Sequence, residues 1–380
     1  ITKIILHTKK SINIAIIGAV SAGKSTFTNA LFIEQYSDMK IKRTTALPQI
    51  YVESAVKLSS KSKREILDRN IAKNTKLMSD TEGDTKLTIE NVEKIIYSVP
   101  KLKNFVSVDD IGFTIHDIPG INDSSSKEVY YEYVRREFHR YDIVMMIVDI
   151  NSAFNTSDEV EILEMILTEI KNNKSKTGIE TQLMILFNKA DDMEIGDGGT
   201  YIPSCEELQE MYAQAKNIIK SCKTKIIPEL VVRVVPISAE DAFIYRMYHN
   251  NPKVTLPKKH MDKLGVNEYG KSRWNRKSSS EKASALKTLT RTITKDFKEH
   301  MAMSGFNNMT DQLKKILQPS NICTYLTNHI KYELSQISEK NTSAEIAQVM
   351  VRLEVRRKDY NNILTRYCCI KTLTQLNKMN

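Results

Sequence analysis

Short apolar runs alternate with longer amphipathic segments along the first 240 residues of the chain. Five runs have the length of a strand, at residues 12–18, 113–120, 143–150, 181–187 and 230–237. Runs of this kind are typical of strands buried on both faces of a parallel sheet, with helices in the connections. The pattern predicts an α/β fold with a mostly parallel sheet flanked by helices.

The segments between these runs contain start and stop signals for helices. Helices are expected at residues 25–35, 156–172, 204–225, 281–301 and 305–317. Two of them begin with capping-box pairs, Thr156 with Glu159 and Ser204 with Glu207. The last one ends before Pro319, which cannot continue a helix.

Two polar stretches interrupt this alternation and are predicted to be insertions. Residues 55–105 are rich in lysine and have a helical patch near residues 89–97, so we expect a surface helix with a loop. Residues 249–282 contain Gly, Ser, Lys, Arg and Trp274, the single tryptophan, and are expected to form a loop.

The C-terminal end has helical periodicity. Residues 321–340 and 343–377 are expected to form two helices, and the apolar stripe of the second suggests packing against other helices. We therefore divide the chain into a domain at 1–317 and a helical segment at 318–380.

The amino-acid composition narrows the class of protein to which the chain can belong. The 380 residues are 41% hydrophobic and 27% charged, which is typical of soluble globular proteins. An odd number of cysteines, five, suggests reduced thiols rather than disulfides. No apolar run approaches the ~18 residues of a membrane-spanning helix, and no signal peptide precedes Ile1, so we expect a cytoplasmic protein. Because the chain begins without Met, it also fits a fragment of a longer one.

The net charge of +10 is concentrated near the C-terminus. Residues 251–380 hold 24 Lys and Arg against 11 Asp and Glu, whereas the first 250 residues are slightly acidic. Such an excess fits nucleic acid or an anionic membrane surface as a partner. Solvated lysine-rich helix faces are the alternative, and the sequence leaves both open.

The candidate chemistry begins with a glycine loop after the first strand. It matches G-x-x-x-x-G-K-[ST] through Gly18, Gly23, Lys24 and Ser25. The glycines let backbone N–H groups approach phosphate oxygens, the lysine would reach the β/γ oxygens, and the serine hydroxyl would ligate Mg²⁺. We expect nucleoside triphosphate contacts throughout the loop, from Gly18, Ala19, Val20, Ser21, Ala22, Gly23, Lys24, Ser25 and Thr26.

Two further segments have the features of γ-phosphate sensors. Thr44 and Thr45 lie on an expected loop, and Thr45 is the preferred residue to close over Mg²⁺ and the γ-phosphate. The strand at 113–120 ends in D-x-x-G, so Asp117 would hold a Mg²⁺-bound water and the Gly120 N–H would contact the γ-phosphate. The predicted metal residues are therefore Ser25, Thr45 and Asp117. We expect His116 to be packed beside the sheet.

The base is predicted from N-K-x-D after the strand at 181–187. Asp191 can accept hydrogen bonds from N1–H and the exocyclic amino group of guanine, which adenine does not offer. Asn188 would also tie this loop to the phosphate loop, and the stem of Lys189 would cover the base. Ser238 and Ala239 follow the fifth strand, where the Ala239 N–H would meet guanine O6. The predicted ligand is GTP with Mg²⁺.

In this order the motifs GAVSAGKST, RTTALP, DIPG and NKAD resemble the GTPase domain of the dynamin superfamily. The segment GFNNMTDQL is similar to the place where such domains meet a helical bundle. The resemblance implies a phosphate-loop GTPase that forms a homodimer or higher oligomer through its nucleotide face. It also implies coupling of GTP hydrolysis to membrane remodelling, with the protein peripheral to a membrane.

Two positions depart from the family pattern, because Val20 and Ile121 replace the glutamines that usually orient water. We expect catalysis to rest on Ser21, Lys24, Thr45 and Gly120. The resemblance also implies a monovalent cation held with the help of Ser21. Slow turnover without a dimer partner is the resulting hypothesis.

The alternative function is a regulatory or RNA-associated GTPase that uses the basic C-terminal third on RNA. No KH-type RNA-binding module is recognised. Long amphipathic helices favour the dynamin-like GTPase that acts on membranes. No lipid-binding domain is recognised either, so membrane contact is implied by the resemblance alone.

Overall fold

The structure is a computed structural model. It describes residues 11–39, 47–79, 92, 94–102, 112–121, 126–178, 180–191, 193–196, 201–318, 321–322 and 324–325. The helices expected at 321–340 and 343–377 lie almost wholly outside them.

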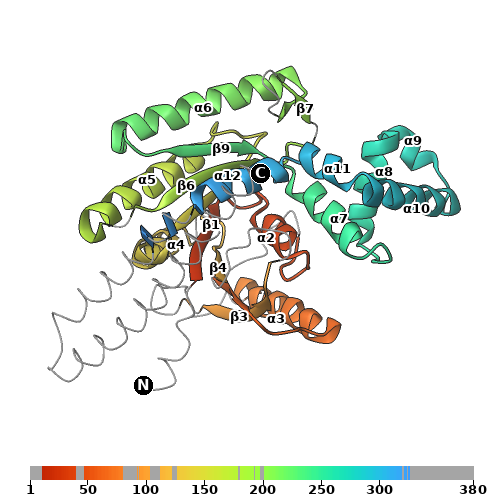
Figure 1. Ribbon diagram of the computed structural model, residues 1–380, viewed down its shortest axis with the longest axis horizontal. Coiled ribbons are helices and arrows are strands. Elements are labelled where there is room, and N and C mark those ends of the chain that lie inside the picture. The colour runs from red at the N-terminus through yellow and green to blue at the C-terminus, as the bar shows by residue number, and fades with distance from the viewer. Residues whose placement is uncertain are drawn as a thin grey trace, which may run out of the picture.

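A seven-stranded sheet forms the centre of the described chain (Figure 1). Its spatial order is β3-β2-β4-β1-β5-β6-β9. The bounds are β1 Ser11–Gly18, β2 Gln49–Ser54, β3 Ile95–Pro100, β4 Gly112–Asp117, β5 Ile143–Asp149, β6 Gln182–Asn188 and β9 Val232–Pro236. Five strands, from β4 to β9 in that order, run parallel, whereas β2 is antiparallel to β4 and pairs in parallel with β3. The predicted α/β fold is confirmed.

Helices cover both faces of the sheet. On one face lie α2 (Lys24–Phe32), α7 (Ala239–Asn250) and α12 (Phe306–Ile316). On the other lie α4 (Lys127–Glu137), a 3-10 turn at Phe138–Arg140, α5 (Ser157–Thr177) and α6 (Glu206–Ile226). Strand residues alternate between the two cores, so Met145 packs on the first and Met146 on the second.

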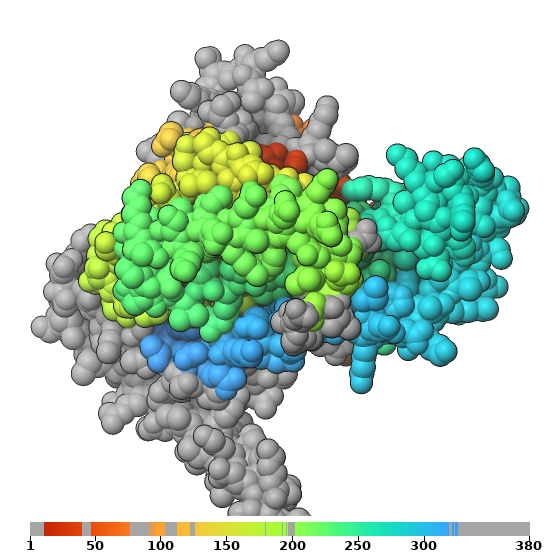
Figure 2. Space-filling view, turned by 90° about the horizontal axis from the view of Figure 1, so that it is seen from above, coloured from red at the N-terminus to blue at the C-terminus, as the bar shows by residue number. Residues whose placement is uncertain are grey.

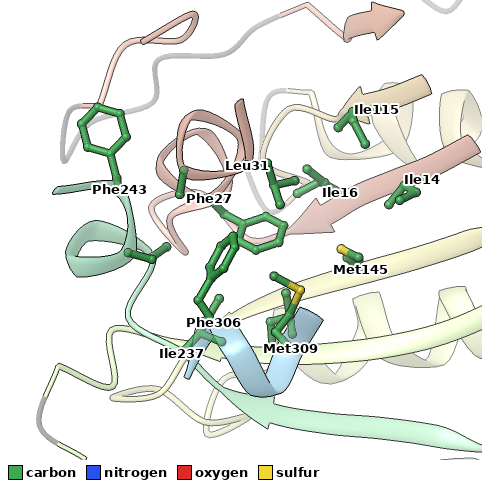
Figure 3. Packing of buried hydrophobic residues seen from close by; sticks show 14 of the residues in the cluster. Ile14, Ile16, Phe27, Leu31, Ile115, Met145, Ile237, Phe243, Phe306 and Met309 are labelled. Carbon is green, nitrogen blue, oxygen red and sulfur yellow. The ribbon is translucent and has the colours of Figure 1, made fainter. Parts of the chain in front are cut away.

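Aromatic packing holds the helix that follows the glycine loop. The rings of Phe27 in α2 and Phe306 in α12 have centroids 6.2 Å apart, and Figure 3 shows them facing each other beside Met309. Their fully buried neighbours on the sheet include Ile14 and Ile16 of β1. The first core therefore fixes α2 directly behind the loop.

Residues 249–282, expected to form a loop, are mostly helical. They form α8 (Lys258–Tyr269), α9 (Lys271–Arg276) and the start of α10 (Ser279–Lys295), and α11 (Phe297–Met303) follows. This helical projection, α8–α10, stands out from the sheet body in Figures 1 and 2. Because Trp274 and Leu264 supply much of its small buried face, the hydrophobic pattern is too sparse to read as helix.

The insertion at 55–105 also differs from the expectation. Its helix, α3, spans Ser60–Ser79, and the patch near 89–97 expected to be helical gives way to strand β3. Ile95, Tyr97 and Val99 are buried while Ile96 is 63% exposed, which is the period of a strand.

The starts of α5 and α6 differ from the prediction. Thr156 is the N-cap of α5, but its hydroxyl accepts no capping bond, and Glu159 accepts from the Phe154 N–H instead. Helix α6 begins after Cys205 rather than Ser204. A complete box does form between Ser278 and Glu281 at the start of α10.

Helix α2 ends at Phe32, short of the expected Gln35, because Ile33 adopts a left-handed conformation with φ 54°.

Across the described residues, no helix is both long and apolar enough to cross a bilayer.

Candidate nucleotide-binding site

The predicted motifs meet at one edge of the sheet. Residues 18–26, 118–121, 188–191 and 237–239 each follow the carboxyl end of a parallel strand, namely β1, β4, β6 and β9. Ligands of open α/β sheets bind at this edge. The topology thus brings together residues as far apart in sequence as Gly18 and Ala239.

Two glycines of the first loop have no room for a side chain. A Cβ on Gly18 would lie 2.2 Å from the Ile147 carbonyl oxygen. Gly23 has φ 95°, and a Cβ there would lie 2.0 Å from Nδ2 of Asn188. Ser21 also takes a left-handed conformation, with φ 64°, and its side chain is exposed. The loop is therefore compact, with its serine turned outward.

Lys24 begins α2 and is 6% exposed. Its Nζ donates to the carbonyl oxygens of Gly18 at 3.1 Å and Ala19 at 2.7 Å. The lysine thus folds back over the loop. Ser25 and Thr26 follow on the first turn of the helix and are half-buried. The N-terminal end of α2 points its partial positive charge towards the loop.

Asp117 ends β4 and is fully buried. Among the described residues neither of its carboxylate oxygens has a hydrogen-bond partner. Burial raises its pKa to about 7, although the nearby charge of Lys24 acts in the opposite direction. An unpaired buried carboxylate is costly, so the position fits a group that takes up a hydrated cation such as Mg²⁺.

Backbone contacts hold the D-x-x-G turn against the glycine loop. The Ile118 N–H donates to the Ile16 carbonyl at 3.1 Å, and the Ile121 N–H donates to that of Gly18 at 3.4 Å. A Cβ on Gly120 would lie 2.4 Å from Cγ2 and 2.7 Å from Cα of Val20. The two apolar replacements, Val20 and Ile121, therefore sit where these loops touch.

Asn188 links three segments of the site. Its Nδ2 donates to the Ala22 carbonyl at 2.8 Å, and its Oδ1 accepts from the Ala239 N–H at 2.9 Å. The expected tie between this loop and the phosphate loop is present. Because the Ala239 N–H is already bonded here, its contact with guanine O6 remains a prediction.

Lys189 turns the loop with φ 66°, and its Nζ pairs with the carboxylate of Asp149 at the end of β5. Asp191 lies at the surface, its side chain 43% exposed. Its Oδ1 accepts from the Ser238 hydroxyl at 2.7 Å. Ser238 also caps α7 by accepting from the Asp241 N–H.

The sequence reasoning missed Lys263 of α8. Its Nζ lies 3.0 Å from Oδ1 of Asp191, so a residue from the helical projection touches the expected base loop. No sequence signal marked it, because it lies in the stretch expected to be a loop and 72 positions after its partner.

The threonines expected to close over Mg²⁺ and the γ-phosphate, Thr44 and Thr45, lie outside the described residues. His116 is buried, its Nε2 lies 3.2 Å from Oδ1 of Asn13, and burial lowers its pKa to about 3, so it is a neutral packed residue as expected. Cys205 and Cys222 are free thiols.

Part of the chain is similar in sequence to a known protein family. Residues 14–183, from β1 into β6, match the sequence profile of the dynamin family. The matched segment, a little under half of the chain, is similar to the dynamin family. It contains the glycine loop and D-x-x-G of the site, whereas N-K-x-D lies just beyond it.

The individual relatives of this chain are distant. An uncharacterised protein of Acanthamoeba polyphaga mimivirus is 21% identical over 256 residues, which cover 63% of this chain and 39% of that protein. The tRNA modification GTPase MnmE of Finegoldia magna is 26% identical over 181 residues, 47% of this chain and 35% of MnmE. The chain thus spans less than two fifths of either curated relative.

Among solved structures, a chain from an oligomerised bacterial dynamin pair is similar. It aligns with 99% of this chain and 59% of its own length, with 17% identity and a TM-score of 0.41.

Proposed function

We propose that this protein binds GTP with Mg²⁺ and hydrolyses it to GDP and phosphate. The observation that carries the proposal is the convergence of the glycine loop, D-x-x-G and N-K-x-D at one sheet edge. There Asn188 bonds both the glycine loop and the backbone of Ala239. The loop N–H groups and Lys24 would bind the phosphates, and Asp191 would select guanine.

The residues available for the metal fit this proposal. The Ser25 hydroxyl would ligate Mg²⁺ directly, the unpaired carboxylate of Asp117 would hold one of its waters, and Thr45 would close over it. A bound Mg²⁺ would supply positive charge that offsets the negative charge developing on the phosphates during transfer. The Gly120 N–H would contact the γ-phosphate.

The two positions where related GTPases carry a glutamine that orients the attacking water are apolar here, Val20 and Ile121. The chain would orient it through the backbones of Thr45 and Gly120, with Ser21 placed beside the β–γ bridge. Such a site is expected to be slow alone and faster when a second copy faces it. A monovalent cation near Ser21 would add to this, so turnover is expected to be higher in K⁺ than in a matched solution of a large organic cation.

The test is competition of GTP and ATP against a fluorescent GDP analogue, beside single-turnover hydrolysis. GTP is expected to compete far better than ATP, and Lys24→Ala is expected to lose both binding and turnover. Equal competition by ATP would contradict the guanine assignment. Turnover per molecule that stays flat with rising protein concentration would contradict activation by a second copy.

We also propose that the protein binds an anionic membrane surface, and the positive charge of the helical projection supports this role. From Lys253 to Lys295 the chain has twelve lysine and arginine residues and three acidic ones. The exposed basic side chains of the projection include Lys258, Lys259, Lys271, Arg273, Arg276, Lys287 and Arg291, and Lys253 lies just before it. A dense basic surface of this kind attracts anionic lipid headgroups.

Binding to vesicles of phosphatidylcholine with and without phosphatidylserine tests this role. A triple variant of α9, Lys271→Glu with Arg273→Glu and Arg276→Glu, is expected to lose binding to the anionic vesicles. The same charge change on α3, Lys61→Glu with Arg64→Glu and Arg69→Glu, is the matched control. Equal binding by all three proteins, or capture of RNA in preference to vesicles, would favour the regulatory alternative.

A further inference from the structure

One lysine of the helical projection lies among three carboxylates next to the base loop. The side chain of Lys263 is 15% exposed. Its Nζ lies 3.0 Å from Oδ1 of Asp191, 3.3 Å from Oδ1 of Asp241 and 3.4 Å from Oε2 of Glu240. Because this ammonium group is largely buried, its ion pairs are screened less by solvent than those of an exposed lysine.

The backbone that presents Lys263 is fixed by packing. A Cβ on Gly265 would lie 2.4 Å from the ring of Trp274, so α8 and α9 are in close contact at this point. The indole Nε1 of Trp274 donates to Asp262 at 2.9 Å. On the other side of α8, Nδ1 of the buried His260 lies 2.8 Å from Oε1 of Glu240. Lys263 is thus held from both sides.

The charge of Lys263 is maintained by its neighbours. Burial by itself lowers the pKa of a lysine, but the carboxylates of Asp241, Asp191 and Glu240 outweigh burial and raise the pKa of Lys263. The group is therefore an ammonium ion with three donors to share.

Ser238 cannot replace this ammonium ion. Its Oγ lies 2.7 Å from Oδ1 of Asp191 and 2.9 Å from Oδ2 of Asp241, yet a hydroxyl has one proton to donate. Two ionised carboxylates around one hydroxyl would repel each other. Lys263 lies within reach of both and removes this conflict.

We propose that Lys263 is a positioning residue for guanine recognition, which fixes Oδ1 of Asp191 so that the rest of the carboxylate faces the base. The inference rests on the proposed function, in which Asp191 binds guanine. Lys263 touches the carboxylate and not the nucleotide. Its effect falls on the contact that requires both carboxylate oxygens, which is the pair of bonds to N1–H and the exocyclic amino group.

The prediction is specific because inosine lacks that amino group. A carboxylate free to rotate loses mainly the second hydrogen bond, so GTP is weakened and ITP is not. A merely structural role, such as neutralising Asp241 under α7, would weaken both nucleotides together or neither. The ratio of GTP to ITP affinity therefore separates positioning from structure.

The experiment measures competition of GTP and ITP against a fluorescent GDP analogue for the wild type, Lys263→Met and Lys259→Met. Lys259 is the matched control, since it lies on the same helix, is 56% exposed and reaches Glu240 at 3.6 Å. We expect the GTP-to-ITP affinity ratio to fall about tenfold in Lys263→Met, the discrimination that one buried hydrogen bond supplies, and to stay unchanged in Lys259→Met. An unchanged ratio in Lys263→Met, or an equal loss for both nucleotides, would overturn the inference.

The fluorescence emission of Trp274 reports whether each variant is folded, because this single tryptophan packs on α8. If Lys263→Met unfolds the projection, the double variant Lys263→Met with Asp241→Asn removes the uncompensated buried charge and leaves Asp191 unheld. The same fall in the ratio is expected there, and its absence would overturn the inference. A wild type that does not prefer GTP over ATP would instead contradict the proposed function.

Discussion

The side-chain amide of Asn188 donates to the backbone carbonyl of Ala22 across 2.8 Å, between residues 166 positions apart. Its oxygen accepts from the Ala239 N–H. One buried side chain therefore sets the distance between the phosphate loop and both base loops. Because Gly23 leaves no room for a Cβ beside Nδ2 of Asn188, this contact also explains a glycine of the phosphate motif.

Replacing Asn188 should damage the site and the fold together. Asn188→Ala leaves the Ala22 carbonyl and the Ala239 N–H without their partner in a buried place, which costs about 1–3 kcal/mol for each group. We expect a lower free energy of unfolding in urea and weaker GTP binding. Asn151→Ala is the control, since Asn151 is exposed and bonds only locally, to Asp149. Equal stability of both variants would contradict the assigned link.

Lys24→Met should separate phosphate binding from folding. The methionine keeps most of the buried stem, but the ammonium that bonds the carbonyls of Gly18 and Ala19 is lost. GTP affinity is expected to fall about 10- to 100-fold, the range of charge-assisted hydrogen bonds. Titration of a fluorescent GTP analogue measures this, with Lys253→Met as an exposed control. An affinity within twofold of the wild type would exclude Lys24 from phosphate binding.

Strong local patterns made the sheet and the loops predictable. The run at 143–150 is buried on both faces as β5, and the glycine loop, D-x-x-G and N-K-x-D follow strands as their chemistry requires. A phosphate loop needs backbone N–H groups at fixed spacing, so its sequence is readable without tertiary context.

The features that were predicted wrongly or not at all depend on contacts between segments far apart in the sequence. β3 lies at the edge of the sheet, where its alternation competes with a helical spacing over few residues. Lys263 becomes part of the site through the tertiary packing of α8, and no sequence spacing relates it to Asp191. Glu159 accepts hydrogen bonds from the Ser152 hydroxyl and the Phe154 N–H instead of forming the expected capping box.

Gly120→Ala should impair hydrolysis more than nucleotide binding. A Cβ at this position would lie 2.7 Å from Cα of Val20, and a backbone atom cannot move away as a side-chain tip can. The turn must shift, which displaces the N–H expected to contact the γ-phosphate. Single-turnover hydrolysis is expected to fall about 100-fold, as displacements near 1 Å can cause. GDP has no γ-phosphate, so its affinity should change little, and an equal loss of GDP binding would contradict this role.

The stability of the protein should contain a pH dependence that belongs to Asp241. Burial raises the pKa of this carboxyl to about 6 from an ordinary value of 3.8, against the charge of Lys263 and with that of Asp191. Between about pH 4 and pH 6 the folded protein therefore holds a proton that the unfolded chain has released. The free energy of unfolding should fall as pH rises across this window, by about 1–3 kcal/mol.

Asp241→Asn removes this titration and keeps an acceptor for the Ser238 hydroxyl. Urea unfolding at pH 4.5, 5, 6 and 7 gives the slope for each protein, so other groups cancel in the difference from the wild type. The variant should lack the fall that Asp241 contributes, whereas Asp311→Asn, with a side chain 63% exposed, should follow the wild type. Parallel curves for wild type and Asp241→Asn would show that the carboxyl keeps its ordinary pKa. They would also mean that Lys263 compensates Asp241 fully when the protein is folded.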